Sequence, residues 1–286
     1  MMTDTRYARQ VLAFGAEGQE RLQHEHAAII GLGGLGSHVA QQLAYLGVRQ
    51  FTIIDDDRVE ESNLNRLIGA TSSDVSRTKV GVVGDVLRRI DGSIRVRGIE
   101  AELRTRVALK SLGETTAVFG CLDNDGARLV LTEYCCAFRK LYIDSATEIT
   151  PASTNQELDF GGRVVVSIPG EFCLDCANEL DMEAAKQDLE TYEVRRQRVA
   201  HGYGIGTDAP APAVVSLNGV IASLAVTEFM VAVTGVRAPQ RKLTYKGMRG
   251  VVHVTADTRR PDCMNCGYLA GIGDRADILR YVLDRS

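Results

Sequence analysis

A glycine-rich turn between an expected strand and an expected helix constrains the fold of this chain more than any other feature. The apolar run Ala27–Gly31 before the turn predicts a buried strand, and the apolar spacing over Ser37–Gly47 predicts a helix. The glycines of the turn are Gly31, Gly33, Gly34 and Gly36. Such glycines let the backbone turn tightly and let a phosphate reach the free N–H groups at the helix N-terminus.

An acidic residue follows this unit where a nucleotide ribose would be bound. Asp55 lies 19 residues after Gly36, at the end of the next expected strand, Gln50–Asp55. The strand, turn, helix and acid together predict a nucleotide site. Taken alone, this fingerprint fits an NAD- or FAD-dependent oxidoreductase as readily as an enzyme that uses ATP.

The same alternation of strand and helix continues through the first half of the chain. Further strands are expected at Ile94–Ile99, Ala117–Cys121 and Leu141–Asp144. Further helices are expected at Ser76–Asp91, Leu103–Leu112 and Asp125–Phe138. Repeated β–α units with short connections predict a parallel sheet that helices cover on both faces.

After Ala146 the pattern changes to strands that are not separated by regular helices. These strands are expected at Gly162–Ile168, Lys242–Tyr245 and Val251–Thr255, with helices at Val214–Val233 and Arg275–Leu283. The fold class that follows is α/β, with a Rossmann-like parallel sheet that continues into a mixed sheet.

The composition narrows the class of protein. The chain has 286 residues, of which 45% are hydrophobic and 24% charged, and its net charge of -4 gives no reason to expect a nucleic-acid partner. The polar start shows no signal-peptide pattern, and the apolar stretch Val214–Val233 contains Asn218 and Glu228. We therefore expect a cytoplasmic protein, with a core helix in that stretch and no membrane span.

Charged residues around the turn favour a nucleoside triphosphate. Asp55, Asp56 and Asp57 end one expected strand, Asp123 and Asn124 follow another, and two cations, Arg66 and Lys79, lie between them in the sequence. Two cations and a metal-binding carboxylate beside a phosphate-binding helix suit ATP with Mg²⁺. A hydride-transfer enzyme needs neither.

Four of the seven cysteines form two pairs with metal-ligand spacing. The pairs are Cys173 with Cys176 and Cys263 with Cys266. Two CxxC pairs match a tetrahedral Cys₄ zinc site, which with all positions filled is structural and would clip the C-terminal segment to the body. A redox-active CxxC is the alternative, although neither pair opens a helix in a thioredoxin-like unit.

The motifs in their order resemble the ThiF/MoeB/HesA-type adenylyltransferases of the ubiquitin-activating enzyme superfamily. The matching elements are RYARQ, GQE, GLGGLGS, IIDDD, SNLNR, Lys79, LDN and the paired cysteines, and they extend over nearly the whole chain. Each motif alone is weak, but the ordered set is specific. The resemblance implies one adenylation domain over 1–286, with a nucleotide-binding half at 1–146 and a carrier-binding and zinc half at 147–286.

The resemblance also implies roles for residues of this chain. Gly34 and its neighbours would hold the phosphates, Asp55 would bind the ribose, and Asp123 would hold Mg²⁺. The phosphate path would be lined by Asp57, Asn63, Arg66 and Lys79. Arg9 would enter the site of a neighbouring subunit, which requires a homodimer. Asn124 either contributes to the site or only positions Asp123.

The reaction that the resemblance implies is attack by a substrate carboxylate on the α-phosphate of ATP, with loss of pyrophosphate. The expected substrate is a small ubiquitin-like or sulfur-carrier protein that ends in glycine. Since no cysteine lies between Cys176 and Cys263, and Tyr203–Asp208 offers only Thr and Asp, we expect no enzyme-bound thioester. A downstream sulfurtransferase or conjugating enzyme would then receive the adenylate directly. Adenylation of a non-protein carboxylate, an oxidoreductase and a non-catalytic dimer half are the alternatives.

Overall fold

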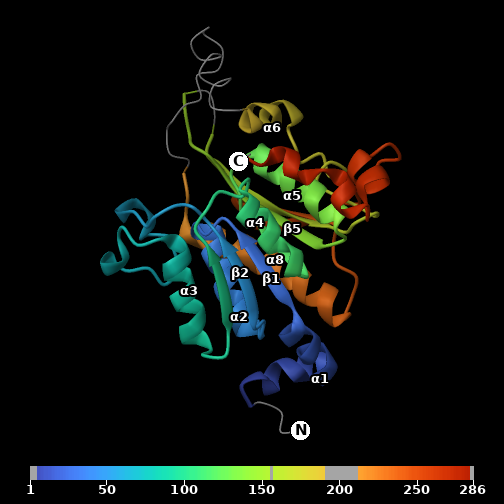
Figure 1. The fold of residues 1–286 in the computed structure, drawn as a ribbon. Coiled ribbons are helices and arrows are strands. Elements are labelled where there is room, and N and C mark those ends of the chain that lie inside the picture. The colour runs from blue at the N-terminus through green and yellow to red at the C-terminus, as the bar shows by residue number, and fades with distance from the viewer. Residues whose placement is uncertain (1–4, 155–156, 191–211, 284–286) are drawn as a thin grey trace.

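One eight-stranded sheet organises the computed structural model, which describes residues 5–154, 157–190 and 212–283 (Figure 1). The strand order is β3-β2-β1-β4-β5-β6-β7-β8. The bounds are β1 His26–Ile30, β2 Gln50–Ile54, β3 Arg95–Ile99, β4 Ala117–Gly120, β5 Leu141–Thr150, β6 Asp159–Ser167, β7 Lys242–Lys246 and β8 Val251–Val254. Strands β3, β2, β1, β4 and β5 pair in parallel with their neighbours, whereas β6, β7 and β8 continue the sheet from β5 in antiparallel pairs. The predicted change from a parallel to a mixed sheet is confirmed.

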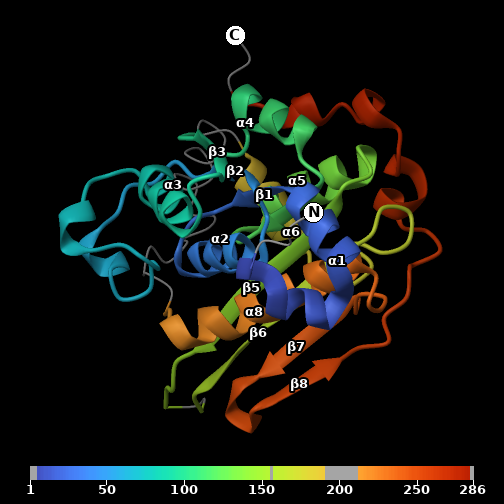
Figure 2. The ribbon, with the colours of Figure 1, turned by 90° about the horizontal axis from the view of Figure 1, so that it is seen from below.

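Helices cover both faces of the sheet (Figures 1 and 2). They are α1 Ala8–His24, α2 Gly34–Leu46, α3 Lys79–Ile90, α4 Arg106–Ser111, α5 Asp125–Ala137, α6 Met182–Leu189 and α8 Val215–Thr234. Helices α1, α2, α3 and α8 contribute to the apolar core on one face, and α4 and α5 to the core on the other. Helices α1 and α6 were not predicted from the sequence.

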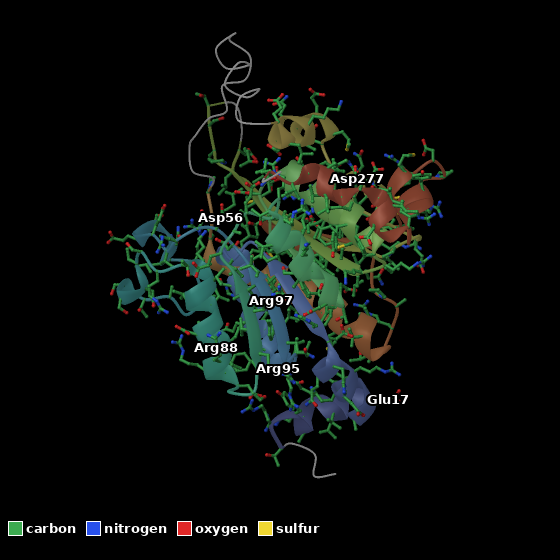
Figure 3. The ribbon with its side chains drawn as sticks, viewed as in Figure 1. Glu17, Asp56, Arg88, Arg95, Arg97 and Asp277 are labelled. Atoms are coloured by element: carbon green, nitrogen blue, oxygen red, sulfur yellow. The ribbon has the colours of Figure 1, made fainter. Side chains whose placement is uncertain are left out.

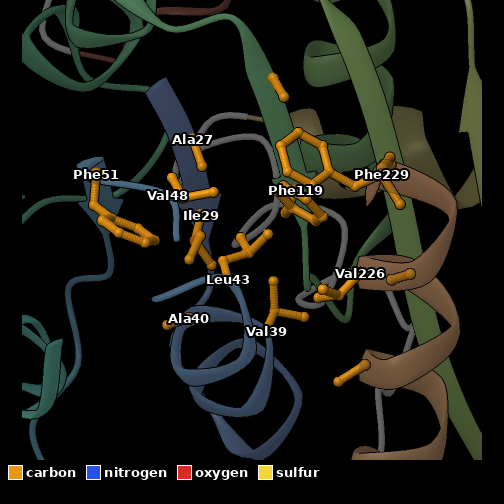
Figure 4. Packing of buried hydrophobic residues seen from close by; sticks show 14 of the residues in the cluster. Ala27, Ile29, Val39, Ala40, Leu43, Val48, Phe51, Phe119, Val226 and Phe229 are labelled. Atoms are coloured by element: carbon orange, nitrogen blue, oxygen red, sulfur yellow. The ribbon is translucent and has the colours of Figure 1, made fainter. Parts of the chain in front are cut away.

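Alternation along the buried strands explains why there are two cores. Ala27 and Ile29 of β1 belong to the core under α2, whereas Ala28 and Ile30 belong to the core under α5. Side chains of a strand point alternately to opposite faces, so a strand buried on both sides is apolar throughout. In the first core, the rings of Phe119 and Phe229 meet edge to face with centroids 5.4 Å apart (Figure 4).

Helix α8 is long and apolar enough to cross a membrane by length and composition, but it packs inside this fold. It contacts α1, α2, β5 and β6, and half of its most apolar window is buried. Its buried Glu228 pairs with Arg237 at 2.6 Å. The expectation of a core helix agrees with this packing.

Local capping sets the helix ends near the glycine turn. Helix α2 begins at Gly34, three residues earlier than expected, and ends at Leu46, where Gly47 caps it with a φ of 110° in the left-handed region. Helix α3 begins later than expected because the Thr78 side chain caps it, accepting from the N–H of Gly81. Gly and Thr are the residues favoured at these two kinds of helix end.

Two sequence-based expectations about element ends were wrong. The predicted helix Arg275–Leu283 is two short 3₁₀ turns, Gly273–Ala276 and Ile278–Tyr281. Asp277 separates them with a φ of 48°, which a continuous helix does not allow. Strand β5 continues six residues past the predicted end at Asp144, because β6 pairs with it from Tyr142 to Thr150. It crosses the expected boundary at residue 146, so both halves contribute strands to one sheet.

Candidate functional site

A cavity of about 960 Å³ opens at the carboxyl ends of the parallel strands. Its walls come from the ends of β1, β2, β4 and β5 and from the first turns of α2 and α5. Strand β1 lies between β2 and β4, so the strand order reverses at this point: β2 and β3 follow on one side of β1, and β4 and β5 on the other. Ligands of open α/β sheets bind at such switch points. Asp56 lies just beyond the end of β2, at the opposite end of the sheet from Arg95 (Figure 3).

The glycine turn forms one wall of this cavity. Gly31, Gly33 and Gly34 line it, and Gly31 has a φ of +85°. Gly36 does not line it: a Cβ there would lie 1.9 Å from the carbonyl oxygen of Gly31. A Cβ at Gly33 would meet nothing within 4 Å. Gly36 therefore permits close packing of α2 on the turn, while Gly33 keeps the approach to the N–H groups open.

Asp55, Asp57 and Lys79 form a charged group at the end of β2. Asp55 is buried, and its Oδ2 accepts from the N–H of Leu32 at 2.6 Å. Nζ of Lys79 lies 2.6 Å from Oδ2 of Asp57 and 3.8 Å from Oδ1 of Asp55. Burial raises the pKa of Asp55, and the positive charge of Lys79 opposes that shift. All three residues line the cavity.

Arg66 and Asn63 take different positions, although both belong to the SNLNR motif. Arg66 lines the cavity and donates to the carbonyl oxygen of Ser62 at 2.6 Å. Asn63 is absent from the described lining residues, and its Oδ1 accepts from the N–H of Glu60 at 3.2 Å. Asn63 thus holds the turn that carries Arg66.

Asp123 and Asn124 lie at the end of β4 and line the cavity. Asn124 caps α5, accepting from the N–H of Ala127 at 2.8 Å, and its Nδ2 lies 3.5 Å from Oδ1 of Asp123. Within the described residues, the carboxylates close enough together to share a metal ion here are Asp55, Asp56 and Asp57. The assignment of Mg²⁺ to Asp123 stays a prediction.

Arg9 lies far from these residues in the single chain. It is exposed on α1, which ends just before β1 begins and so lies at the amino ends of the strands (Figure 1). The cavity is at the carboxyl ends, and Arg9 is not among the residues that line it. Its role stays a prediction.

Three polar residues that sequence analysis did not identify face the cavity with unsatisfied atoms. Nε of Arg128, Oγ of Ser145 and Nδ2 of Asn218 are buried and have no hydrogen-bond partner. Buried polar groups are normally paired, so such atoms at a cavity wall fit a polar ligand. Arg128 follows the cap Asn124 by one helical turn, a signal that could have identified it. Nothing local in the sequence brings Asn218 of α8 to this site.

The four paired cysteines converge on one buried point. The Sγ–Sγ distances are 3.8 Å for Cys173–Cys176, 3.5 Å for Cys173–Cys263 and 3.8 Å for Cys176–Cys266. Zn–S bonds of about 2.3 Å give tetrahedral edges of about 3.8 Å, so the donor set fits zinc. Burial opposes ionisation of the Cys176 thiol, but hydrogen bonds outweigh it and lower the pKa. They come from the backbone N–H of Arg260 and from the other three cysteines of the cluster.

The remaining cysteines are poor candidates for covalent chemistry. Cys121 lines the cavity, but burial and the charge of Asp144 raise the pKa of its thiol well above the usual range. Cys135 and Cys136 are fully buried in α5. Thr207 and Asp208, the alternatives noted in the sequence, lie outside the described residues.

Comparisons with known proteins place the chain in a family. The model of the ThiF family matches residues 7–265. The chain belongs to the ThiF family. The molybdopterin-synthase adenylyltransferase of Escherichia coli (strain K12) is 30% identical over 268 residues, which cover 92% of this chain and 96% of that protein. The sulfur carrier protein ThiS adenylyltransferase of the same organism is 32% identical over 166 residues, or 57% of this chain and 62% of that protein.

Solved structures agree on the fold. The crystal structure of E. coli MccB with ATP has a TM-score of 0.70 and 22% identity, and covers 93% of this chain and 75% of that one. PaaA has a TM-score of 0.65 and 20% identity, with 89% and 85% covered. This ThiF-family chain is an adenylyltransferase that uses ATP. Membership of this family supports the ATP interpretation of the glycine fingerprint over the oxidoreductase alternative.

Proposed function

We propose that this ThiF-family enzyme adenylates the C-terminal glycine carboxylate of a small ubiquitin-like or sulfur-carrier protein. The observation that carries the proposal is the cavity at the glycine turn, which Arg66, Lys79 and Arg128 line. Its wall also holds the buried polar atoms without hydrogen-bond partners that are described above. Relatives named for molybdopterin synthase and for ThiS support a protein substrate. The similarity to the molybdopterin-synthase adenylyltransferase extends over nearly the full length of both proteins.

In the proposed reaction, a carboxylate oxygen of the substrate forms a bond to the α-phosphorus of ATP, and the bond to pyrophosphate breaks. Negative charge grows on the phosphate oxygens and on the leaving group. Lys79 and Arg66, fixed by Asp57 and by the carbonyl of Ser62, hold positive charge beside that path. Fixed charges aimed at developing charge need no reorganisation during the reaction.

The glycine turn and Asp55 would orient the nucleotide. Helix α2 begins at Gly34, and Gly33 and Gly34 line the cavity, so the free N–H groups of its first turn would suit a phosphate there. Both oxygens of Asp55 accept backbone N–H groups, from Leu32 and Asp57, which fixes the carboxylate in place. Each carboxylate oxygen can accept a second hydrogen bond, so Asp55 has acceptor capacity left for a ribose hydroxyl.

Two metal ions belong to the proposal. Mg²⁺ near Asp123 would neutralise charge on the phosphates. Zinc at Cys173, Cys176, Cys263 and Cys266 would serve stability, because all four tetrahedral positions are taken by the chain. The enzyme acts as a homodimer in this proposal, with Arg9 of one copy beside the phosphates of the other.

A covalent carrier intermediate is not part of the proposed mechanism. The raised thiol pKa keeps Cys121 protonated at neutral pH, and no cysteine occurs between Cys176 and Cys263. The acyl-adenylate would pass directly to a downstream sulfurtransferase or conjugating enzyme in the cytoplasm.

Exchange of radioactive pyrophosphate into ATP tests the reaction. With Mg²⁺ and a carrier that ends in Gly-Gly, we expect exchange that depends on the carrier and that Asp123→Ala abolishes. The same carrier with its last glycine deleted is the matched control. Exchange with free amino acids or short acids in place of the carrier would instead support a non-protein carboxylate. No exchange with any carboxylate would contradict the proposal.

A further inference from the structure

Asp144 lies between two arginines that line two different cavities. It is on β5, and its side chain is fully buried. Arg128 lines the cavity at the glycine turn. Arg163 lines a second cavity of about 390 Å³, whose walls come mainly from β5, β6 and β7. The two cavities share Ala146, two residues further along β5.

The two oxygens of Asp144 are divided between the arginines. Oδ1 accepts from the hydroxyl of Tyr142 at 2.9 Å and lies 3.7 Å from Nε of Arg128. Oδ2 forms an ion pair with Nη1 of Arg163. One buried carboxylate is therefore the counter-ion of two guanidinium groups.

Each arginine also has partners that the other lacks. Arg128 donates to the carbonyl oxygen of Leu122 at 2.8 Å and lies 3.5 Å from Asp125. Arg163 pairs through Nε with Glu179, which also lies 2.7 Å from Nζ of Lys242. No contact joins Arg128 to Arg163 among the described residues. Asp144 is the ion-pair partner that the two arginines share.

We propose that Asp144 is a positioning residue that couples the second cavity to the nucleotide cavity. While Arg163 holds one oxygen, Asp144 neutralises Arg128 only in part, and Arg128 keeps positive charge for the phosphates. When Arg163 is removed or engaged elsewhere, the whole charge of Asp144 falls on Arg128, and its attraction for phosphate weakens. Such effects are strong where burial excludes water.

The coupling has a consequence for ligands. An anionic group that binds Arg163 in the second cavity would draw this arginine away from Asp144 and so weaken the hold on ATP. By linkage, ATP would weaken binding of that group by the same factor. This inference rests on the proposed function in one respect, namely that the nucleotide cavity binds ATP.

Equilibrium binding of Mg·ATP, measured by calorimetry without any carrier, tests the coupling. We expect Arg163→Gln to raise the Kd roughly five- to tenfold, within the range seen for members of one ion network. Arg163→Lys keeps a positive charge beside Asp144 and should stay within about twofold of wild type. In an Arg128→Gln background, Arg163→Gln should cause no further change.

Lys246→Gln is the matched control, since Lys246 lines the second cavity and has no ion pair with Asp144. It removes a positive charge from another residue that lines the second cavity and should leave the Kd unchanged. The coupling is overturned if Lys246→Gln weakens ATP as much as Arg163→Gln, if Arg163→Gln has no effect, or if the double variant is additive. Failure of the wild type to bind ATP at all would instead refute the proposed function. Thermal unfolding of each variant verifies that it is folded.

Discussion

Single side chains near the cavity have two kinds of role, and only one kind is visible in a motif. Lys79, Asp57 and Arg66 are charged residues that the sequence pattern assigned to the phosphate path, and they do line the cavity. Asn63 and Asn124 belong to the same motifs, but they hold turns or cap helices. A motif reports that a residue type is needed at a position. It does not report whether the side chain meets the ligand or the backbone.

His26 gives a pH dependence at the scale of one residue. It begins β1, and its Nε2 lies 2.9 Å from Oγ1 of Thr52. Burial lowers its pKa from 6.5. The unfolded chain therefore takes up the proton first as the pH falls below 6.5, and stability is lost between that value and the lower pKa of the folded state.

Urea unfolding between pH 5 and 8 measures this contribution. The wild type should lose stability below about pH 6.5 more steeply than His26→Gln, which cannot titrate. His38, whose pKa burial also lowers, is present in both proteins and cancels in the difference. Parallel curves for the two proteins would contradict the assignment.

At the scale of elements, the turn into α2 separates stability from binding. Gly36 packs against the backbone of Gly31, whereas Gly33 borders open space and has a φ of -68° that any residue accepts. Gly36→Ala should destabilise the protein by about 1–3 kcal/mol or more, because its Cβ overlaps a carbonyl oxygen. Gly33→Ala should leave the melting temperature nearly unchanged and weaken ATP binding roughly tenfold, because its methyl group narrows the approach of phosphate.

Melting curves and ATP titrations of the two variants check this pair. Both changes add one methyl group to the same turn, so the difference between the two variants in stability and in ATP affinity is the informative result. Equal loss of stability in both variants would show that the glycines serve only the packing of α2.

Local signals predicted only some element ends. Gly47 caps the end of α2 as expected, whereas the Thr78 cap was not recognised and α3 was expected to begin at Ser76. The last predicted helix was wrong because Asp277 adopts a left-handed conformation that apolar spacing cannot report. Strand β5 was predicted too short because its second part is polar and is held by β6, a partner distant in sequence.

At the scale of the whole molecule, the four cysteines join segments far apart in the sequence. Cys173 and Cys176 follow β6, and Cys263 and Cys266 follow β8. The distances between their sulfurs suit zinc, and a metal that binds only the folded chain stabilises it.

Metal analysis and chelation test this clip. We expect one zinc ion per chain, lost in Cys263→Ser. Removal of the ion should lower stability by several kcal/mol, or roughly 10 °C in melting temperature. Cys135→Ala, at a buried cysteine outside the cluster, should keep the zinc. A purified wild type without zinc that melts at the same temperature as the chelated protein would refute the structural role.

The sequence by itself determined the α/β class, the nucleotide turn, the cations beside it and the paired cysteines. Each of these depends on residue type at short spacing, which local sterics and hydrogen bonding translate directly into structure. Only the tertiary structure decided that Asn218 of α8 and Arg128 of α5 border the same cavity, and that Asp144 lies between two arginines. These placements depend on packing of elements distant along the chain, and no periodicity or spacing records which buried polar groups then meet.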